Sequence, residues 1–310
     1  MIGKSRRMKV RTADYIPPKI PGSIEAPGLQ LSRHGSIILI GSPTERFRHR
    51  MIRTKVALFA LLALGTHMPA SDNPPLAGAS PVLVELFTSE GCSSCPPADA
   101  LLQKLDRDQP VSGTQVIVLS EHVDYWNHLG WKDPYSSRFF SDRQNSYGRH
   151  FGLNSVYTPQ MVVDGAAELT GSDSHRASAA NETASHLQKI PIRISVLSLK
   201  APDTLSLHVE AGPLAASSAR KNGEVYVAVA LNRAESEVAA GENGGRHLSH
   251  TAVVQSLTKV GLLENGKGFA RDLQIPLQPR TDATNLRVIA FVQESESGHV
   301  LGATMQRVGQ

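Results

Sequence analysis

The chain contains only two cysteines, Cys92 and Cys95, in the sequence Cys-Ser-Ser-Cys. The apolar run 82–87 before them predicts a buried strand, and two prolines directly after them can open a helix over about 97–107. The N–H groups and the dipole at a helix N-terminus stabilise a thiolate. A strand, a Cys-x-x-Cys pair and a helix in this order are typical of the redox motif of thioredoxin-like folds.

An apolar segment lies well inside the N-terminal region. Residues 51–55 are basic and are followed by the apolar run 56–64, which is too short to span a membrane and matches the start of a secretory signal peptide. We therefore predict that Met51 is the true start and that 51–79 is a signal peptide cleaved after Ala79 rather than Ala70. Residues 1–50 would be a misread upstream stretch or a disordered extension. An uncleaved N-terminal anchor is the alternative.

The excess of basic over acidic residues lies in the first 50 residues of the chain. The formal net charge is +4, but residues 1–50 hold ten Lys and Arg against three Asp and Glu. From Ser80 onward there are 20 Lys and Arg against 24 Asp and Glu, a net charge of −4, so we predict no nucleic-acid partner. Export to the periplasm or out of the cell is the predicted location, with no stable membrane span after cleavage. A cysteine pair can stay oxidised there.

Two kinds of secondary structure follow the leader. Between 81 and 188 the patterns predict strands at 82–87, 116–119, 161–163 and 166–169, with a second helix capped by Ser136 or Ser137 and a third capped by Ser172 or Asp173. This order predicts an α/β thioredoxin-like domain at 81–188. From 191 to 310 the chain reads as an all-β, sandwich-like domain. Its predicted strands are 192–199, 204–209, 224–231, 247–257, 269–275, 286–293 and 300–307.

Four ordered segments resemble domain-of-unknown-function family 1223, secreted proteins with a thioredoxin-like fold. They are Phe-Thr-Ser-Glu-Gly-Cys-Ser-Ser-Cys-Pro-Pro-Ala-Asp (87–99), the blocks 122–126 and 129–133, Tyr-Thr-Pro-Gln-Met-Val-Val (157–163) and 245–250. The resemblance covers about 81–310 and implies fold and export, but no reaction. It also implies that the Thr158–Pro159 bond is cis, with the proline beside the cysteine pair. Its missing N–H would leave neighbouring backbone groups free to pair with an extended substrate.

The leading hypothesis for the cysteines is thiol–disulfide exchange. Cys92 is expected to lie nearer the helix N-terminus and to be the more exposed of the two. It would be the nucleophile, and Cys95 would resolve the mixed disulfide. A structural bridge and metal ligation remain open. Glu85, within the apolar strand, is a candidate acceptor for the proton of the resolving thiol. Its side chain could equally pair with a lysine.

Polar and aromatic residues follow the second predicted strand, at the sheet edge that also carries the cysteines. They either line a substrate groove or form a packed loop over the helices. The residues are His122, Asp124, Tyr125, Trp126 and Trp131. His122 and Asp124 would share one side of an extended chain.

A metal site would need further ligands. Cys92, Cys95, His122 and Met161 would suit Cu(I), whereas His247 and His250 point to opposite faces of a predicted strand and make a poor chelate. No nucleotide or hydrolase motif occurs, so we predict no cofactor. The sequence thus favours a thiol–disulfide oxidoreductase acting on exported proteins with thiols or disulfides, or with an unknown redox partner. A metal carrier and a non-catalytic binding module with a structural disulfide are the alternatives.

Overall fold

The computed structural model describes residues 79–309 except 201–203, 215–221 and 280. The predicted extension at 1–50 and the signal peptide up to residue 78 lie outside the described residues. Within the described ranges, no helix is long and apolar enough to cross a membrane.

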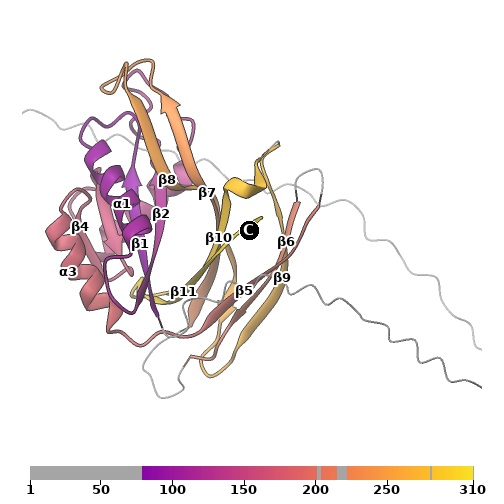
Figure 1. The fold of residues 1–310 in the computed structure, drawn as a ribbon. Helices are drawn as coiled ribbons and strands as arrows, with labels where there is room; N and C mark the ends of the chain where they lie inside the picture. The colour runs from indigo at the N-terminus through magenta and orange to yellow at the C-terminus, as the bar shows by residue number, and fades with distance from the viewer. Residues whose placement is uncertain (1–78, 201–203, 215–221, 280, 310) are drawn as a thin grey trace, which may run out of the picture. The chain divides into compact units, whose positions relative to one another are not determined.

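The fold is mixed α/β, with one large mixed sheet and a second small sheet (Figure 1). The large sheet has eight strands in the order β11-β10-β7-β8-β2-β1-β3-β4, and the small sheet has the order β5-β6-β9. The large sheet comprises β1 (Ser80–Thr88), β2 (Thr114–His122), β3 (Gln160–Val163), β4 (Ala167–Thr170), β7 (Gly223–Glu237), β8 (His247–Leu263), β10 (Leu286–Glu294) and β11 (Val300–Arg307). The small sheet comprises β5 (Ile192–Lys200), β6 (Thr204–Ala211) and β9 (Phe269–Pro276).

The helices are α1 (Pro96–Asp108), α2 (Arg138–His150) and α3 (Ser174–Ser185), with a short 3-10 helix η1 (Ala283–Asn285). The side chain of Ser137 caps α2 and that of Asp173 caps α3, as predicted. Apolar side chains of α1 and α3 pack on one face of β1 to β4. Those of α2 pack on the opposite face, where Phe140 and Tyr147 are buried.

The segments 81–188 and 191–310 share one sheet. Strand β2 runs parallel to β1 and also pairs in parallel with β8, through Ser120 and Val253. All seven strands predicted after residue 190 are present, but four of them continue the large sheet. The small sheet covers the other face of β7 and β10 over an aliphatic core, and this part of the molecule has two packed sheets.

Strands β7 and β8 form a hairpin that is longer than predicted. They have 15 and 17 residues and stay paired as far as Glu237 and His247. In Figure 1 this hairpin projects beyond the neighbouring strands. We call residues 238–246, which connect the two strands, the hairpin tip. Gly241 and Gly245 there have φ angles of 76° and 81°, a conformation that glycine adopts without a steric penalty.

Candidate functional site

Cys92 and Cys95 form a disulfide where β1 ends and α1 begins. Cys95 is the N-cap residue of α1, and its carbonyl oxygen accepts hydrogen bonds from the N–H groups of Ala98 and Asp99 at 2.8 and 3.1 Å. Two prolines then occupy the first helical positions, where no intrahelical N–H partner is lost. The predicted position of the pair at a strand–helix junction is confirmed.

The expectation that Cys92 is the more exposed cysteine is wrong, because both cysteines are 0 % exposed. The hairpin tip covers this part of the chain. The Asn243 side-chain amide donates to the carbonyl oxygens of Glu90 and Cys92 at 2.8 and 2.9 Å. The Glu242 carboxylate accepts hydrogen bonds from the Ser93 N–H and hydroxyl at 3.1 and 2.6 Å. Residues that are 149 to 153 positions away in sequence therefore hold the disulfide loop in place.

One side chain of the loop contacts sulfur directly. The Ser94 hydroxyl oxygen lies 3.4 Å from the Sγ atom of Cys92, within hydrogen-bond distance for sulfur. When the disulfide is reduced, a hydroxyl donor at this position stabilises a thiolate on Cys92.

The Thr158–Pro159 peptide bond is cis, as the family resemblance implies. The Thr158 hydroxyl accepts a hydrogen bond from the Trp126 indole N–H at 2.8 Å. A Cβ atom on Gly171 would lie 3.1 Å from the Cβ atoms of both Pro159 and Ala98. The proline is thus close to the first turn of α1, on the same side of the sheet as that helix.

Glu85 is buried, as predicted, but it lies on the other side of the sheet. Its neighbours Val84 and Leu86 pack in the core beneath α1, and strand side chains alternate between faces. The Glu85 carboxylate accepts hydrogen bonds from Arg143 at 2.7 Å and from the Tyr147 hydroxyl at 2.5 Å, both on α2. The predicted relay is not supported by this geometry, and the partner is an arginine rather than a lysine. Burial, and then the charge of Glu85, raise the pKa of neighbouring Glu121 well above its ordinary value.

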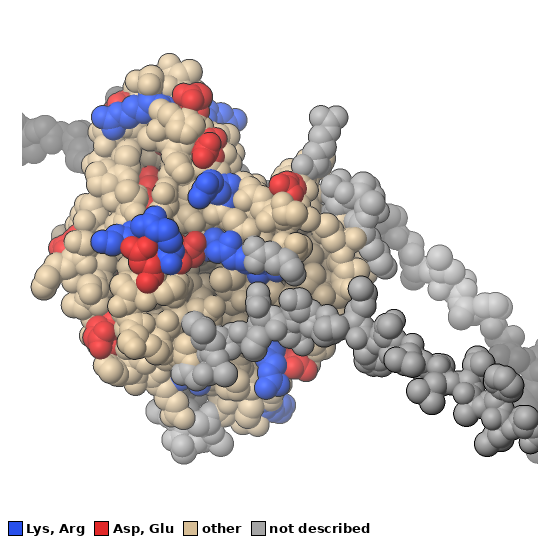
Figure 2. Space-filling view, in the orientation of Figure 1, with Lys and Arg blue, Asp and Glu red and all other residues tan. Residues whose placement is uncertain are grey.

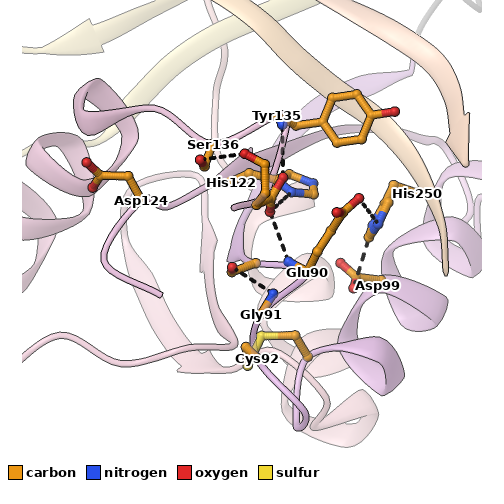
Figure 3. A network of polar contacts seen from close by, with 12 residues as sticks. Glu90, Gly91, Cys92, Asp99, His122, Asp124, Tyr135, Ser136 and His250 are labelled. Atoms are coloured by element: carbon orange, nitrogen blue, oxygen red, sulfur yellow. Dashed lines mark hydrogen bonds and ion pairs between the residues drawn. A yellow bond between two sulfur atoms is a disulfide. The ribbon is translucent and has the colours of Figure 1, made fainter. Parts of the chain in front are cut away.

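The five predicted groove residues do not meet on one surface. His122 is fully buried and bonds Asp133, whereas Asp124 turns away to accept a hydrogen bond from Ser141 at 2.5 Å (Figure 3). The Tyr125 hydroxyl donates to Gln144 of α2. Of the five, Trp126 lies beside the disulfide loop. A Cβ atom built on Gly91 would be only 3.2 Å from the Cβ atom of Trp126.

A buried network of charged side chains lies next to the disulfide, above it in Figure 3. The ring nitrogens of His250 are 3.6 and 3.7 Å from carboxylate oxygens of Glu90 and Asp99, and the Trp131 indole donates to Glu90 at 2.7 Å. Burial opposes a charge on His250, but Asp99 and Glu90 outweigh it and raise the pKa of His250 to about 10. The imidazolium therefore balances the charge of one of these two carboxylates. Glu90 lies two residues before Cys92, and Asp99 lies four residues after Cys95.

Asp133 connects this network to β2. One of its carboxylate oxygens pairs with the Nδ1 atom of His122 at 2.7 Å and accepts the Glu90 backbone N–H at 2.9 Å. Burial would raise the pKa of Asp133, but His122 and backbone donors lower it. The His122 and His250 rings also meet edge to face, with centroids 4.8 Å apart.

Sequence reasoning assigned no role to Glu90, Asp99, Asp133 or Asn243, and it treated His250 only as a poor metal ligand. A signal was nevertheless present. Glu90 and Asp99 lie in segment 87–99, Asp133 ends the block 129–133 and His250 ends segment 245–250. Three of the segments that carry the family resemblance therefore converge on this network.

The geometry offers little to a metal ion. Among residues 79–309, leaving out the ranges not described, no group of three or more His, Cys, Asp and Glu side chains is arranged to hold one. His122, proposed with Met161 as a copper ligand, is bonded to Asp133 instead.

The family described as "Protein of unknown function (DUF1223)" matches residues 83–293. The chain belongs to this family. The resemblance seen in the sequence is thus confirmed, and the DUF1223 match spans both the cysteine pair and most of the C-terminal strands. No curated protein matches the chain.

Two solved structures are similar over most of the DUF1223 chain. Protein AGR_C_4864 from Agrobacterium tumefaciens is 26 % identical, with a TM-score of 0.58, over 75 % of this chain and 96 % of that one. HBP35 of Porphyromonas gingivalis is 14 % identical, with a TM-score of 0.52, over 75 % of this chain and 76 % of that one. The second likeness is one of fold alone.

Proposed function

We propose that this DUF1223 protein is an exported, thioredoxin-like thiol–disulfide oxidoreductase that acts through Cys92 and Cys95. The observation that carries the proposal is the disulfide at the N-terminus of α1, on the side of the sheet where cis-Pro159 lies. A bridge that closes so short a loop removes little chain entropy, so stability alone is a weak reason for it.

The arrangement around the pair supports a thioredoxin-like interpretation. The elements run β1, α1, β2, α2, β3, β4, α3, and the corresponding strands are adjacent in the order β2-β1-β3-β4. Strands β1 and β2 are parallel, and β3 is antiparallel to both β1 and β4. The predicted signal peptide supports export, and exported proteins with thiols or disulfides are the proposed partners.

The exchange begins at the Sγ atom of Cys92, which lies 3.4 Å from the Ser94 hydroxyl oxygen. A partner thiolate attacks the Cys92 Sγ atom, which forms a mixed disulfide and releases Cys95 as a thiolate that takes up a proton. A second thiolate of the partner then attacks the mixed disulfide. It leaves with the first as a partner disulfide, and Cys92 and Cys95 are both reduced. Two electrons and two protons pass to the protein, and the reverse sequence oxidises it again.

We infer that the hairpin tip moves before this attack takes place, because Cys92 is fully buried and the tip is bonded to its loop. The contacts to be broken are the hydrogen bonds of Asn243 and Glu242 with residues 90, 92 and 93. Only the exposed Glu242 contacts are open to water from the start. We infer that a partner, or a spontaneous opening of the tip, uncovers the disulfide.

The same burial favours a second candidate, a binding module in which the disulfide is inert. In that case the network of Glu90, Asp99 and His250 holds the loop in place, and the protein acts through another surface.

The reduction potential of the Cys92–Cys95 pair separates the two candidates. We would equilibrate the protein in glutathione buffers, trap free thiols by alkylation and count them by mass spectrometry. A potential above roughly −250 mV is expected for an exchange-competent pair. A potential below roughly −300 mV would mark a structural bridge and refute the oxidoreductase. A Cys92→Ser, Cys95→Ser variant sets the background of the alkylation.

A further inference from the structure

A polar cavity of about 480 Å³ lies between α1, the β7–β8 pair and the ends of β10 and β11. Four arginines line it, Arg107, Arg233, Arg287 and Arg307, against a single carboxylate, Asp106. Figure 2 shows separate blue atoms over this part of the molecule, where β7 and β10 lie in Figure 1. The cavity is notable because the chain from Ser80 onward has a net charge of −4.

The positive charge of Arg287, the buried arginine of the cavity, is already balanced by Asp106. Buried Arg287 makes a two-pronged contact with Asp106, at 2.8 and 2.9 Å, and donates to the Asn232 side chain. Arg307 lies directly opposite Arg287 on the neighbouring antiparallel strand. Like charges in that position repel each other, and Asp106 has both oxygens engaged with Arg287.

Two guanidinium groups remain without a counter-charge. Arg107 pairs with Asp108, but no carboxylate pairs with the exposed side chains of Arg233 or Arg307 among the residues that the structure describes. The protonated ring of His250 forms part of the wall, and its two partner carboxylates, Glu90 and Asp99, do not line the cavity. Among the side chains that line the cavity, Arg233 and Arg307 therefore carry the two positive charges that no carboxylate pairs with.

We propose that this cavity binds a small, polar molecule through an oxyanion, a phosphate or carboxylate group held between Arg233 and Arg307. Planar guanidinium groups bind both anions with paired hydrogen bonds. No aliphatic, Phe, Tyr or Trp side chain lines the cavity, so a hydrophilic ligand fits better than an apolar acid. Its volume is within the range of small-molecule sites and exceeds that of a single phosphate ion. The ligand therefore carries further hydrogen-bonding groups.

The test is a titration of the isotope-labelled protein with inorganic phosphate and, separately, with succinate at low ionic strength, followed by NMR. We expect at least one anion to bind more tightly than about 1 mM. The ring signals of His250 should shift, while those of His208, a half-buried residue on β6 that does not line the cavity, should not. A response to phosphate alone assigns a phosphate ligand, a response to succinate alone assigns a carboxylate, and a response to both assigns a general oxyanion site.

Matched double variants locate the site. Arg233→Ala with Arg307→Ala removes two exposed guanidinium groups from the cavity, and Arg138→Ala with Arg149→Ala removes two exposed ones from α2. We expect the first pair to weaken binding about tenfold or more and the second to leave it unchanged. The proposal is overturned if neither anion binds, or if the cavity variant binds as well as the wild type. Neither result bears on the cysteine pair.

Discussion

The side-chain amide of Asn243 lies 2.9 Å from the carbonyl oxygen of Cys92, although 151 residues separate them in the chain. The same amide reaches the carbonyl oxygen of Glu90 at 2.8 Å, and Asn243 is fully buried. Two backbone groups of the disulfide loop thus have their hydrogen-bond partner in the hairpin tip.

Replacing Asn243 should uncover the disulfide. Asn243→Ala loses two buried hydrogen bonds, each worth about 1 kcal/mol, so we expect the pair to be reduced by a phosphine at least about tenfold faster than in the wild type. Asn285→Ala is the control, because its amide also bonds two backbone groups, the N–H and C=O of Arg233, far from the cysteines. Equal rates for Asn243→Ala and wild type would show that the tip does not limit access.

Acid should loosen the same cover. Hydrogen bonds from the Ser93 hydroxyl and N–H lower the pKa of Glu242 below its ordinary value of 4.5. The contact is therefore complete above pH 4.5 and is lost as the pH falls through the lowered pKa. At each pH, the rate at which a phosphine reduces the protein disulfide is divided by the rate at which it reduces oxidised glutathione. We expect this ratio to rise below pH 4.5. Glu242→Gln cannot titrate and should show no such acceleration, and a parallel rise in both proteins would contradict this explanation.

His250 should make stability depend on alkaline pH. Its pKa is raised from 6.5 to about 10, so its contribution is complete below pH 6.5 and is lost as the pH rises through about 10. At 1.36 kcal/mol per pKa unit, the loss is at most about 5 kcal/mol. Urea unfolding of wild type and His250→Gln from pH 7 to 10.5 measures it. Parallel pH profiles for the two proteins would mean that the ring is not charged in the fold.

Removing Arg143 should leave the buried Glu85 carboxylate uncompensated. The guanidinium of Arg143 bonds Glu85 and lies 3.5 Å from Glu121, and both acidic side chains are fully buried. We expect Arg143→Ala to lower the free energy of unfolding by about 3–5 kcal/mol. The exposed Arg138→Ala, on the same helix, should change it by less than about 0.5 kcal/mol. A loss below about 1 kcal/mol in the first variant would indicate that water reaches this pair.

A side chain at Gly165 should destabilise the contact between the β3–β4 turn and the β10–β11 turn. A Cβ atom there would lie 1.9 Å from the carbonyl oxygen of Gly298, and the φ angle is +63°. Gly152 has a similar φ of +68° with nothing within 4 Å, so Gly152→Ala reports the backbone strain alone. We expect Gly165→Ala to be less stable than Gly152→Ala by about 1–3 kcal/mol in urea unfolding. Equal stabilities would mean that the two turns can separate freely.

Local patterns in the sequence predict the elements well. The apolar run of β1, the prolines that open α1 and the caps Ser137 and Asp173 all involve neighbours within a few residues, and each is found where expected. The same holds for every strand after residue 190, because alternation and turn residues are also local signals.

The environment of the site could not be predicted in this way. The carbonyl oxygen of Cys92 is bonded by Asn243, and the charge of His250 depends on Glu90 and Asp99. In each case the partner comes from a distant part of the chain. Periodicity contains no information on which strand pairs with β2, so it could not place the hairpin tip over the disulfide. The face of Glu85 was readable from the alternation in β1, but its partner on α2 was not.

Strand β2 lies between β1 and β8 in the large sheet, and this position determines whether the N-terminal part of the chain can be produced as a separate fragment. A fragment that ends near residue 190 would keep the cysteines and α1 to α3, but it would lose the β2–β8 pairing at Ser120 and Val253 and leave β2 as the edge strand of the remaining sheet. Ile117 and Leu119 on that strand would also lose the apolar cover of Ile289 and Phe291. Exposed edges of this kind invite intermolecular pairing and aggregation. We therefore expect a fragment without the C-terminal strands to self-associate, so residues 81–188 should be expressed together with them.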